Sequence, residues 1–154
     1  MRDWLSFLSG EGIEELTIRN WYGAQLTLPS DIYSRTDLKH LELHHCKLPS
    51  LETLFVFPKL LTVELLYVSF VSGTFWEFIV RCPSLEFLKV DFATTKQMRH
   101  VELTKVRNIK KLHLSFGISN QPTTITASNL FRLASLTKLE NITLDFQDCN
   151  VSPI

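Results

Sequence analysis

Hydrophobic residues along this chain recur in a short frame, with apolar side chains at the first, fourth and sixth of six positions. The frame occurs six times, at residues 13–18, 38–43, 60–65, 85–90, 109–114 and 139–144. In every copy one polar residue separates the last two apolar residues, which is the alternation of a strand with one buried side. The pattern therefore predicts strands at residues 14–19, 39–44, 61–66, 86–91, 110–115 and 140–145.

The spacing of the frames predicts how these strands are arranged. Successive frames begin 25, 22, 25, 24 and 30 residues apart, and the first four intervals lie within the roughly 20–29 residues of a leucine-rich repeat. Residues 38–48 also fill the full L-x-x-L-x-L-x-x-N/C-x-L signature. We expect an α/β fold, a short right-handed leucine-rich-repeat solenoid with a parallel concave β-sheet of five or six strands.

Short helices or irregular returns are expected on the convex side of the solenoid. Residues 74–81 predict a helix, because Phe75, Phe78 and Ile79 share one face, and Pro83 prevents its continuation. Residues 128–134 predict a second helix and residues 3–8 an amphipathic turn, whereas Leu28-Pro29 and Phe57-Pro58 favour irregular returns. Residues 1–154 are read as a single domain, with residues 1–12 as the N-terminal cap and 146–154 as an incomplete C-terminal end.

Composition narrows the class of protein. The 154 residues carry 16 basic and 16 acidic side chains, so no net field attracts nucleic acid or an anionic membrane. The start of the chain lacks the apolar core of a signal peptide, and no apolar stretch approaches the roughly 20 residues of a membrane helix. Three dispersed cysteines favour a reducing compartment. We expect an intracellular protein, in the cytoplasm or nucleus.

Functional side chains are expected on the face of the sheet that turns away from the core. Within each strand the residues that alternate with the buried ones point outward, and parallel stacking places them in rows. The candidate protein-binding residues of this concave face are His40, Glu42, His44, Glu64, Leu66, Phe87, Lys89, Asp91, Lys111 and His113. Phe87 is read equally as an aromatic anchor for a partner and as a side chain packed under a loop.

Catalytic and metal sites are not expected. Glu42 and Glu64 are neighbours in one row and could form an acid–base pair, but Lys89 follows in that row and a solvated face is the preferred interpretation. His40 and His44 stand about 13 Å apart along one strand, too far to share a metal ion. No phosphate-binding or nucleophile motif is present, so no cofactor is expected. Cys46 is read as a buried structural thiol.

Several segments resemble the plant F-box/FBD/leucine-rich-repeat family. Residues 28–48 contain an L-P segment and an aromatic-Ser pair, Tyr33-Ser34, before a cysteine-containing repeat. Residues 78–88 contain the element C-P-x-L-E-x-L, and residues 4–16 are similar to the opening segment of the family. The resemblance covers only the leucine-rich-repeat portion, since the F-box and FBD segments are not visible in this chain. It implies the substrate-recognition arm of an SCF-type ubiquitin ligase.

The sequence thus predicts a non-enzymatic protein–protein interaction module. The alternative is a stand-alone regulatory or inhibitory binder that occupies a partner of longer family members, and a hydrolase is a remote third. The expected partner is another protein. A Skp-class adaptor is not expected without an F-box, nor are nucleic acid or membrane, and self-association through an uncapped terminal repeat is a further option.

Overall fold

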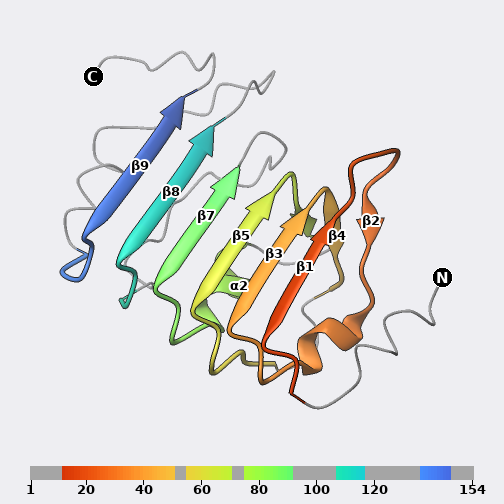
Figure 1. Cartoon of the computed structure of the whole chain (residues 1–154), viewed down its shortest axis with the longest axis horizontal. Coiled ribbons are helices and arrows are strands. Elements are labelled where there is room, and N and C mark those ends of the chain that lie inside the picture. Colours follow the sequence, from red (N-terminus) through yellow and green to blue (C-terminus); the bar gives the residue numbers. More distant parts are fainter. Residues whose placement is uncertain (1–11, 51–54, 71–74, 92–106, 117–135, 147–154) are drawn as a thin grey trace.

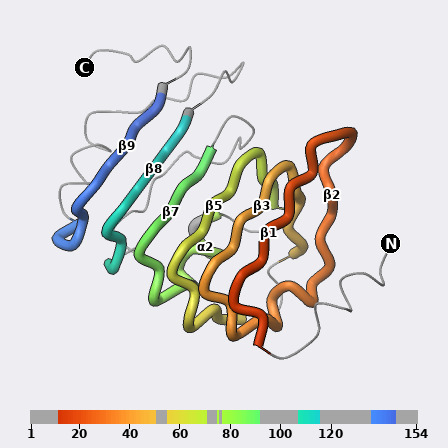
Figure 2. Tube along the Cα trace, viewed as in Figure 1, coloured from red at the N-terminus to blue at the C-terminus, as the bar shows by residue number. Residues whose placement is uncertain are grey.

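The computed structural model describes residues 12–50, 55–70, 75–91, 107–116 and 136–146. Its main feature is a sheet of six parallel strands lying side by side (Figure 1). The strands, in their order across the sheet, are β1 (Glu15–Arg19), β3 (His40–His44), β5 (Thr62–Leu66), β7 (Phe87–Asp91), β8 (Lys111–Phe116) and β9 (Asn141–Phe146). Spatial order follows chain order, so each turn of chain stacks on the one before, as the trace in Figure 2 shows. The predicted solenoid of six parallel strands is confirmed.

The strands pair without any offset between equivalent frame positions. Leu16 pairs with Leu41, which pairs with Val63, and the same correspondence continues through Leu88 and Leu112. Each strand begins one residue later than predicted. At every step two consecutive backbone N–H groups donate to one carbonyl of the preceding turn, as Lys39 and His40 both do to Glu14 O at 2.7 and 3.0 Å. The regular hydrogen-bond pattern of each strand begins after this shared acceptor, which explains why the strand starts one residue later than predicted.

Inward side chains of the frames form the core. In β3, β5 and β7 the second and fourth residues are buried and the others partly exposed, which matches the alternation in the sequence. Leu41, Leu43, Val63, Leu65 and Leu88 have almost no exposed surface. Burying such a side chain contributes about 1.5–3 kcal/mol, and no single turn can enclose its own leucines, so the neighbouring turns stabilise one another.

A second, smaller sheet was not predicted. It contains β2 (Leu26–Thr27), β4 (Cys46–Leu48) and β6 (Ser69–Phe70), paired in parallel in that order. The chain bends from the large sheet toward the small one at His45 and at Tyr67, whose φ angles are 53° and 54°. These positions follow the last residues of β3 and β5, so the left-handed conformation occurs at the same place in two successive turns.

Two short helices lie in the described parts of the returns. The helix predicted at residues 74–81 is confirmed as α2 (Phe75–Val80), which lies behind the strands in Figure 1. The return after Leu28-Pro29 was expected to be irregular, but it contains the 3₁₀ helix η2 (Ser30–Ser34). Pro29 precedes this helix in an extended conformation, and a 3₁₀ turn suits so short a connection. The elements predicted at residues 3–8 and 128–134 lie outside the described residues.

Aromatic side chains fill the space between the sheet and these helices. The ring of Tyr33 from η2 stacks on Phe55 with centroids 4.1 Å apart, and Phe57 and Phe78 continue the cluster edge to face. The Tyr33 hydroxyl donates to Pro49 O at 2.7 Å, which satisfies its one polar atom. Arg81 covers the other side of Phe55, 4.6 Å from the ring centroid. Interlocking rings of this kind fix the spacing between the back of the solenoid and the sheet.

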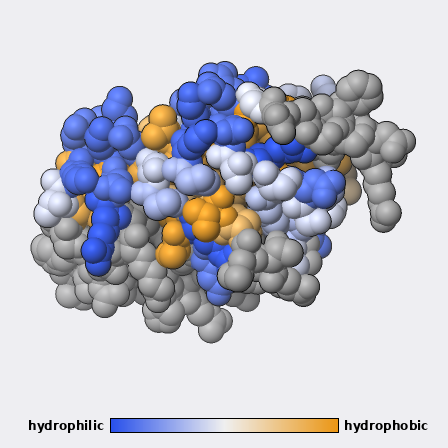
Figure 3. Space-filling view, turned by 90° about the horizontal axis from the view of Figure 1, so that it is seen from below, coloured by the Kyte–Doolittle hydropathy of each residue, from blue (hydrophilic) through white to orange (hydrophobic). Residues whose placement is uncertain are grey.

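Ion pairs connect successive turns where the strands begin. Lys39 Nζ lies 2.6 Å from Glu14 Oε1, and Lys110 Nζ lies 3.1 Å from Glu86 Oε1. Seen from that end, the described surface is mostly hydrophilic, with hydrophobic residues between (Figure 3). Exposed pairs of this type contribute little to stability, about 0–1 kcal/mol each, but they favour the observed register over a shifted one.

Candidate protein-binding face

The outward side chains of the six-stranded sheet form a surface that we call the open face. It consists of the first, third and fifth residues of each strand, in three rows. All ten residues predicted for the concave face lie on it: His40, Glu42, His44, Glu64, Leu66, Phe87, Lys89, Asp91, Lys111 and His113. Lys111 is exposed and the other nine are partly buried. Their common placement follows from the register of the strands.

An ion-paired cluster joins the first two strands of this face. Arg19 on β1 donates from Nε to Glu42 Oε1 at 2.7 Å and from Nη2 to Glu42 Oε2 at 3.0 Å. The two parallel hydrogen bonds match the planar guanidinium to the carboxylate. Hydrogen bonding to Arg19 is the main reason that the pKa of Glu42 is lowered, and that of Arg19 is raised by the same contact. Glu42 is therefore a fixed anion at neutral pH.

His44 completes this cluster in an unusual environment. Its Nε2 is inaccessible to solvent and lies 2.8 Å from Glu42 Oε1, but not in a direction that makes a hydrogen bond with any described residue. The ring of Trp21 meets His44 edge to face with centroids 5.4 Å apart. Burial lowers the pKa of His44, although Glu42 opposes that shift. The imidazole is therefore held neutral against a carboxylate that it would pair with if protonated.

The row that contains Glu42 places two acidic residues side by side and a basic residue next to them. Glu42 pairs in register with Glu64, and Glu64 Oε2 lies 3.4 Å from Lys89 Nζ on the next strand. A catalytic carboxylate pair would require one pKa to be raised so that one member stays protonated. Here the Arg19 contact lowers the pKa of Glu42 instead. The arrangement therefore suits charge recognition better than acid–base catalysis.

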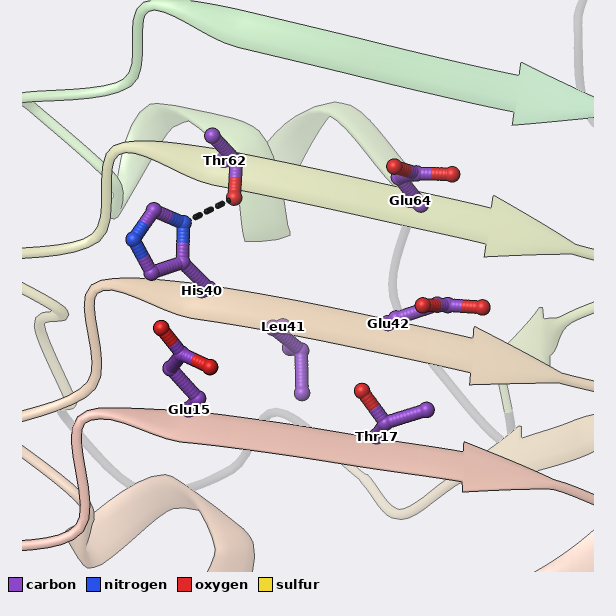
Figure 4. A pocket seen from close by; sticks show the side chains of 7 residues that line it. All are labelled: Glu15, Thr17, His40, Leu41, Glu42, Thr62 and Glu64. Carbon is purple, nitrogen blue, oxygen red and sulfur yellow. Dashed lines mark hydrogen bonds between the residues drawn. The ribbon is translucent and has the colours of Figure 1, made fainter.

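A shallow hollow opens on the first three strands of the face. Its volume is about 260 Å³, and its lining residues are Glu15, Thr17, His40, Leu41, Glu42, Thr62 and Glu64 (Figure 4). Within it His40 Nδ1 and Thr62 Oγ1 share a hydrogen bond of 2.6 Å. Such a pair resembles a nucleophile with its base, but acyl transfer also needs free N–H donors for an oxyanion. The backbone of these strands is hydrogen-bonded within the parallel sheet.

Sequence reasoning missed part of this surface. Glu15, Thr17 and Thr62 line the hollow but were not among the predicted residues. They occupy the same alternating positions as the predicted ones, so the frame itself would have found them. Trp21 and Tyr22 follow β1 and are 67% and 90% exposed, which is unusual for rings of that size. The signal in the sequence was the pair of adjacent aromatic residues, Trp21 and Tyr22, soon after a predicted strand.

The buried thiols are structural. Cys46 is fully buried, its Sγ donates to His44 O at 3.2 Å, and burial raises its pKa to about 11. Burial likewise raises the pKa of Cys82 to about 12. This agrees with the inward position predicted for Cys46, whereas Cys149 lies outside the described residues. Within the described ranges no three ligating side chains converge on a point that could hold a metal ion, and no helix is long and apolar enough to cross a bilayer.

Stacked strand-and-return turns, a leucine core shared between turns and an open strand face define a leucine-rich-repeat domain. The family model described as "FBD-associated F-box protein At5g56370, LRR repeats" matches residues 1–143. The chain therefore belongs to the leucine-rich-repeat family of FBD-associated F-box proteins. No curated protein and no solved structure matches it significantly. A domain of this kind is typically a non-enzymatic protein-interaction module.

Proposed function

We propose that this domain recognises another protein through the open face and serves as the substrate-recognition part of an SCF-type ubiquitin-ligase receptor. The description of the matched family joins such repeats to an F-box protein, which supports the second half of the proposal. The observation that carries the first half is the open face itself. In the described residues, six strands present their outward side chains on one surface, and α2 lies behind them (Figure 1).

The composition of the face supports protein recognition. It combines fixed charges, such as the Arg19–Glu42 pair, with partly buried apolar side chains at Leu66 and Phe87. Interfaces concentrate binding energy in an aromatic or apolar anchor surrounded by polar residues. Phe87 is such a residue, since Lys89 follows it two positions later on its strand and Lys111 pairs with it from β8. The neighbouring hollow on the first three strands is a recess that a partner side chain can enter.

Photo-crosslinking tests the proposal directly. A benzoylphenylalanine group would replace Phe87 in one variant and, as a matched control, Val80, which is 47% exposed on α2 behind the sheet. In extract from the source cells we expect a discrete protein adduct from position 87 and none from position 80. Phe87→Ala should compete poorly for that partner, losing about 2 kcal/mol or more of binding free energy. Equal adducts from both positions, or none, would remove the open face as the recognition surface.

The link to ubiquitination needs a separate measurement. The captured partner would be followed in cells that express this protein, with and without Phe87→Ala. We expect the partner to carry less ubiquitin and to persist longer when the variant is present. A partner bound at position 87 whose ubiquitination does not change would favour the regulatory or inhibitory binder instead.

A further inference from the structure

The first row of the open face carries two charges that have no ion-pair partner among the described residues. This row is Glu15, His40, Thr62, Phe87, Lys111 and Asn141. Glu15 and Lys111 are exposed, and neither forms an ion pair within the part of the chain that the structure describes. The second row differs, because Glu42 is matched by Arg19 and Glu64 by Lys89. Among the described residues the first row therefore offers separated charges of both signs to an incoming molecule, whereas the acidic residues of the second row already have partners.

The residues between these two charges make the row directional. His40 Nδ1 and Thr62 Oγ1 share a hydrogen bond, so these two atoms already have a partner within the domain. Phe87 follows, partly buried and paired in register with Lys111. Read from β1 to β8, the row is an acid, a neutral polar pair, an aromatic ring and a base. The apolar element thus lies beside the base and not midway between the two charges.

Strand spacing sets the distances along the row. Neighbouring strands are about 4.8 Å apart, so four steps place Glu15 about 19 Å from Lys111. Phe87 is three steps, about 14 Å, from Glu15 and one step, about 5 Å, from Lys111. A span of about 19 Å corresponds to about six residues of extended chain or about thirteen residues of helix.

We infer that the partner lays a single protein segment across the strands along this row, with a basic side chain on Glu15, an apolar side chain on Phe87 and an acidic side chain on Lys111. The inference rests on the proposed function and specifies the chemistry of the partner that the function requires. Complementary charges fix which way such a segment lies, because the reversed segment would place like charges together at both ends. Phe87 supplies the contact area that exposed ion pairs alone do not.

A displayed library of randomised sixteen-residue peptides provides a probe that presumes no partner. It would be selected on the wild-type domain and, separately, on the charge-exchanged variant Glu15→Lys/Lys111→Glu. On the wild type we expect enriched peptides with the apolar residue nearer the acidic residue than the basic one. On the exchanged variant we expect the apolar residue nearer the basic one. This readout does not depend on the direction in which a peptide binds.

The same selection can overturn the inference. Equal patterns on both domains, or no enriched peptide, would show that the row does not select a segment of this kind. For peptides that do follow the pattern, Glu15→Gln and Lys111→Gln should each weaken binding about two- to fivefold, and less at high salt.

A matched pair of variants separates this inference from the proposed function. Peptides selected on the wild type would be measured against Phe87→Ala and against Val80→Ala on the far side. Binding that is lost only in Phe87→Ala, with no dependence on charge order, would retain the open face and reject the segment. Binding unchanged in Phe87→Ala would reject both proposals.

Discussion

Glu42 and Arg19 are 23 residues apart in sequence and meet across two neighbouring strands through hydrogen bonds of 2.7 and 3.0 Å. Their side chains extend over the outer surface of the sheet, so the contact orders charge on the open face without belonging to the core. Because the guanidinium hydrogen bonds are the main cause of the lowered Glu42 pKa, their loss has a measurable consequence.

Replacing Arg19 should raise the pKa of Glu42 toward its ordinary value of 4.5. In Arg19→Gln the carboxylate loses both its charged donor and the nearest positive charge, so protonation becomes easier. The side-chain carboxyl resonance of Glu42 would be followed by NMR against pH. Lys111→Gln on β8 is the control and should leave that titration in place; a similar shift in both variants would mean that the Arg19 contact is not its cause.

Acidification should destabilise the domain through His44. Its pKa is lowered in the folded state, mainly by burial, so below the ordinary value of 6.5 the unfolded chain binds a proton that the folded chain excludes. Stability from this residue is fully present above pH 6.5 and decreases as the pH falls toward the folded pKa. We expect His44→Gln to flatten the decline of Tm in this window, and an unchanged slope in that variant would contradict the expectation.

Truncation of two adjacent residues on β7 should cost unequal amounts of stability. Leu88 is fully buried, so Leu88→Ala opens a cavity and should cost about 2–5 kcal/mol of unfolding free energy. Phe87 is partly exposed on the open face, and Phe87→Ala should cost about 1 kcal/mol or less. Denaturant unfolding of the two variants measures the difference. A comparable loss in both would make Phe87 a core residue and leave the open face without its proposed anchor.

The Gln25 side chain should stabilise the contact between the first and third turns through two hydrogen bonds. Its Nε2 donates to Tyr67 O at 3.0 Å and its Oε1 accepts from Ser69 Oγ at 2.7 Å. Gln25→Ala should cost about 1 kcal/mol, since two net hydrogen bonds are lost and Tyr67 O regains water only in part. Combining it with Ser69→Ala forms a double-mutant cycle, and strictly additive losses would argue against a coupled pair.

The last strand should be the least protected of the six. Ile142 is 42% exposed, whereas Leu112 at the equivalent position of β8 is 2% exposed. Because Ile142 is less buried than its counterpart on β8, local opening of β9 costs less free energy. Amides of β9 should therefore exchange with solvent faster than those of β5. Hydrogen exchange followed by mass spectrometry measures this at several protein concentrations. Equal protection of β9 and β5 at a concentration where the domain is monomeric would contradict the expectation.

The large sheet was predictable because the inward leucines determine both burial and register. Each frame places two apolar side chains on one side of a strand, as Leu41 and Leu43 show, so the outward rows follow by alternation. The small sheet was not predictable in this way. Its strands contain two or three residues, too few to show a period, and their pairing depends on the bends at His45 and Tyr67.

Contacts within the open face were only partly predictable. The frame places Glu42 beside Glu64, but it cannot say that Arg19 reaches across to Glu42 or that Trp21 covers His44. Those contacts depend on side-chain rotamers and on the course of a loop, for which the sequence contains no repeating signal. The hollow likewise depends on which of several partly exposed side chains lean away from one another.

Because the strands share one register, changes in the length of the returns and changes in the residues of the open face can occur independently. Successive frames begin 22 to 30 residues apart, yet the first residue of each strand pairs with the first residue of the next strand. Insertions and deletions in the returns therefore leave the coordinates of the face intact, as the residues of the rows are placed by the leucines beside them. A lineage could alter the length of its returns freely while it refines what the rows recognise, or exchange one recognised partner for another without rebuilding the scaffold.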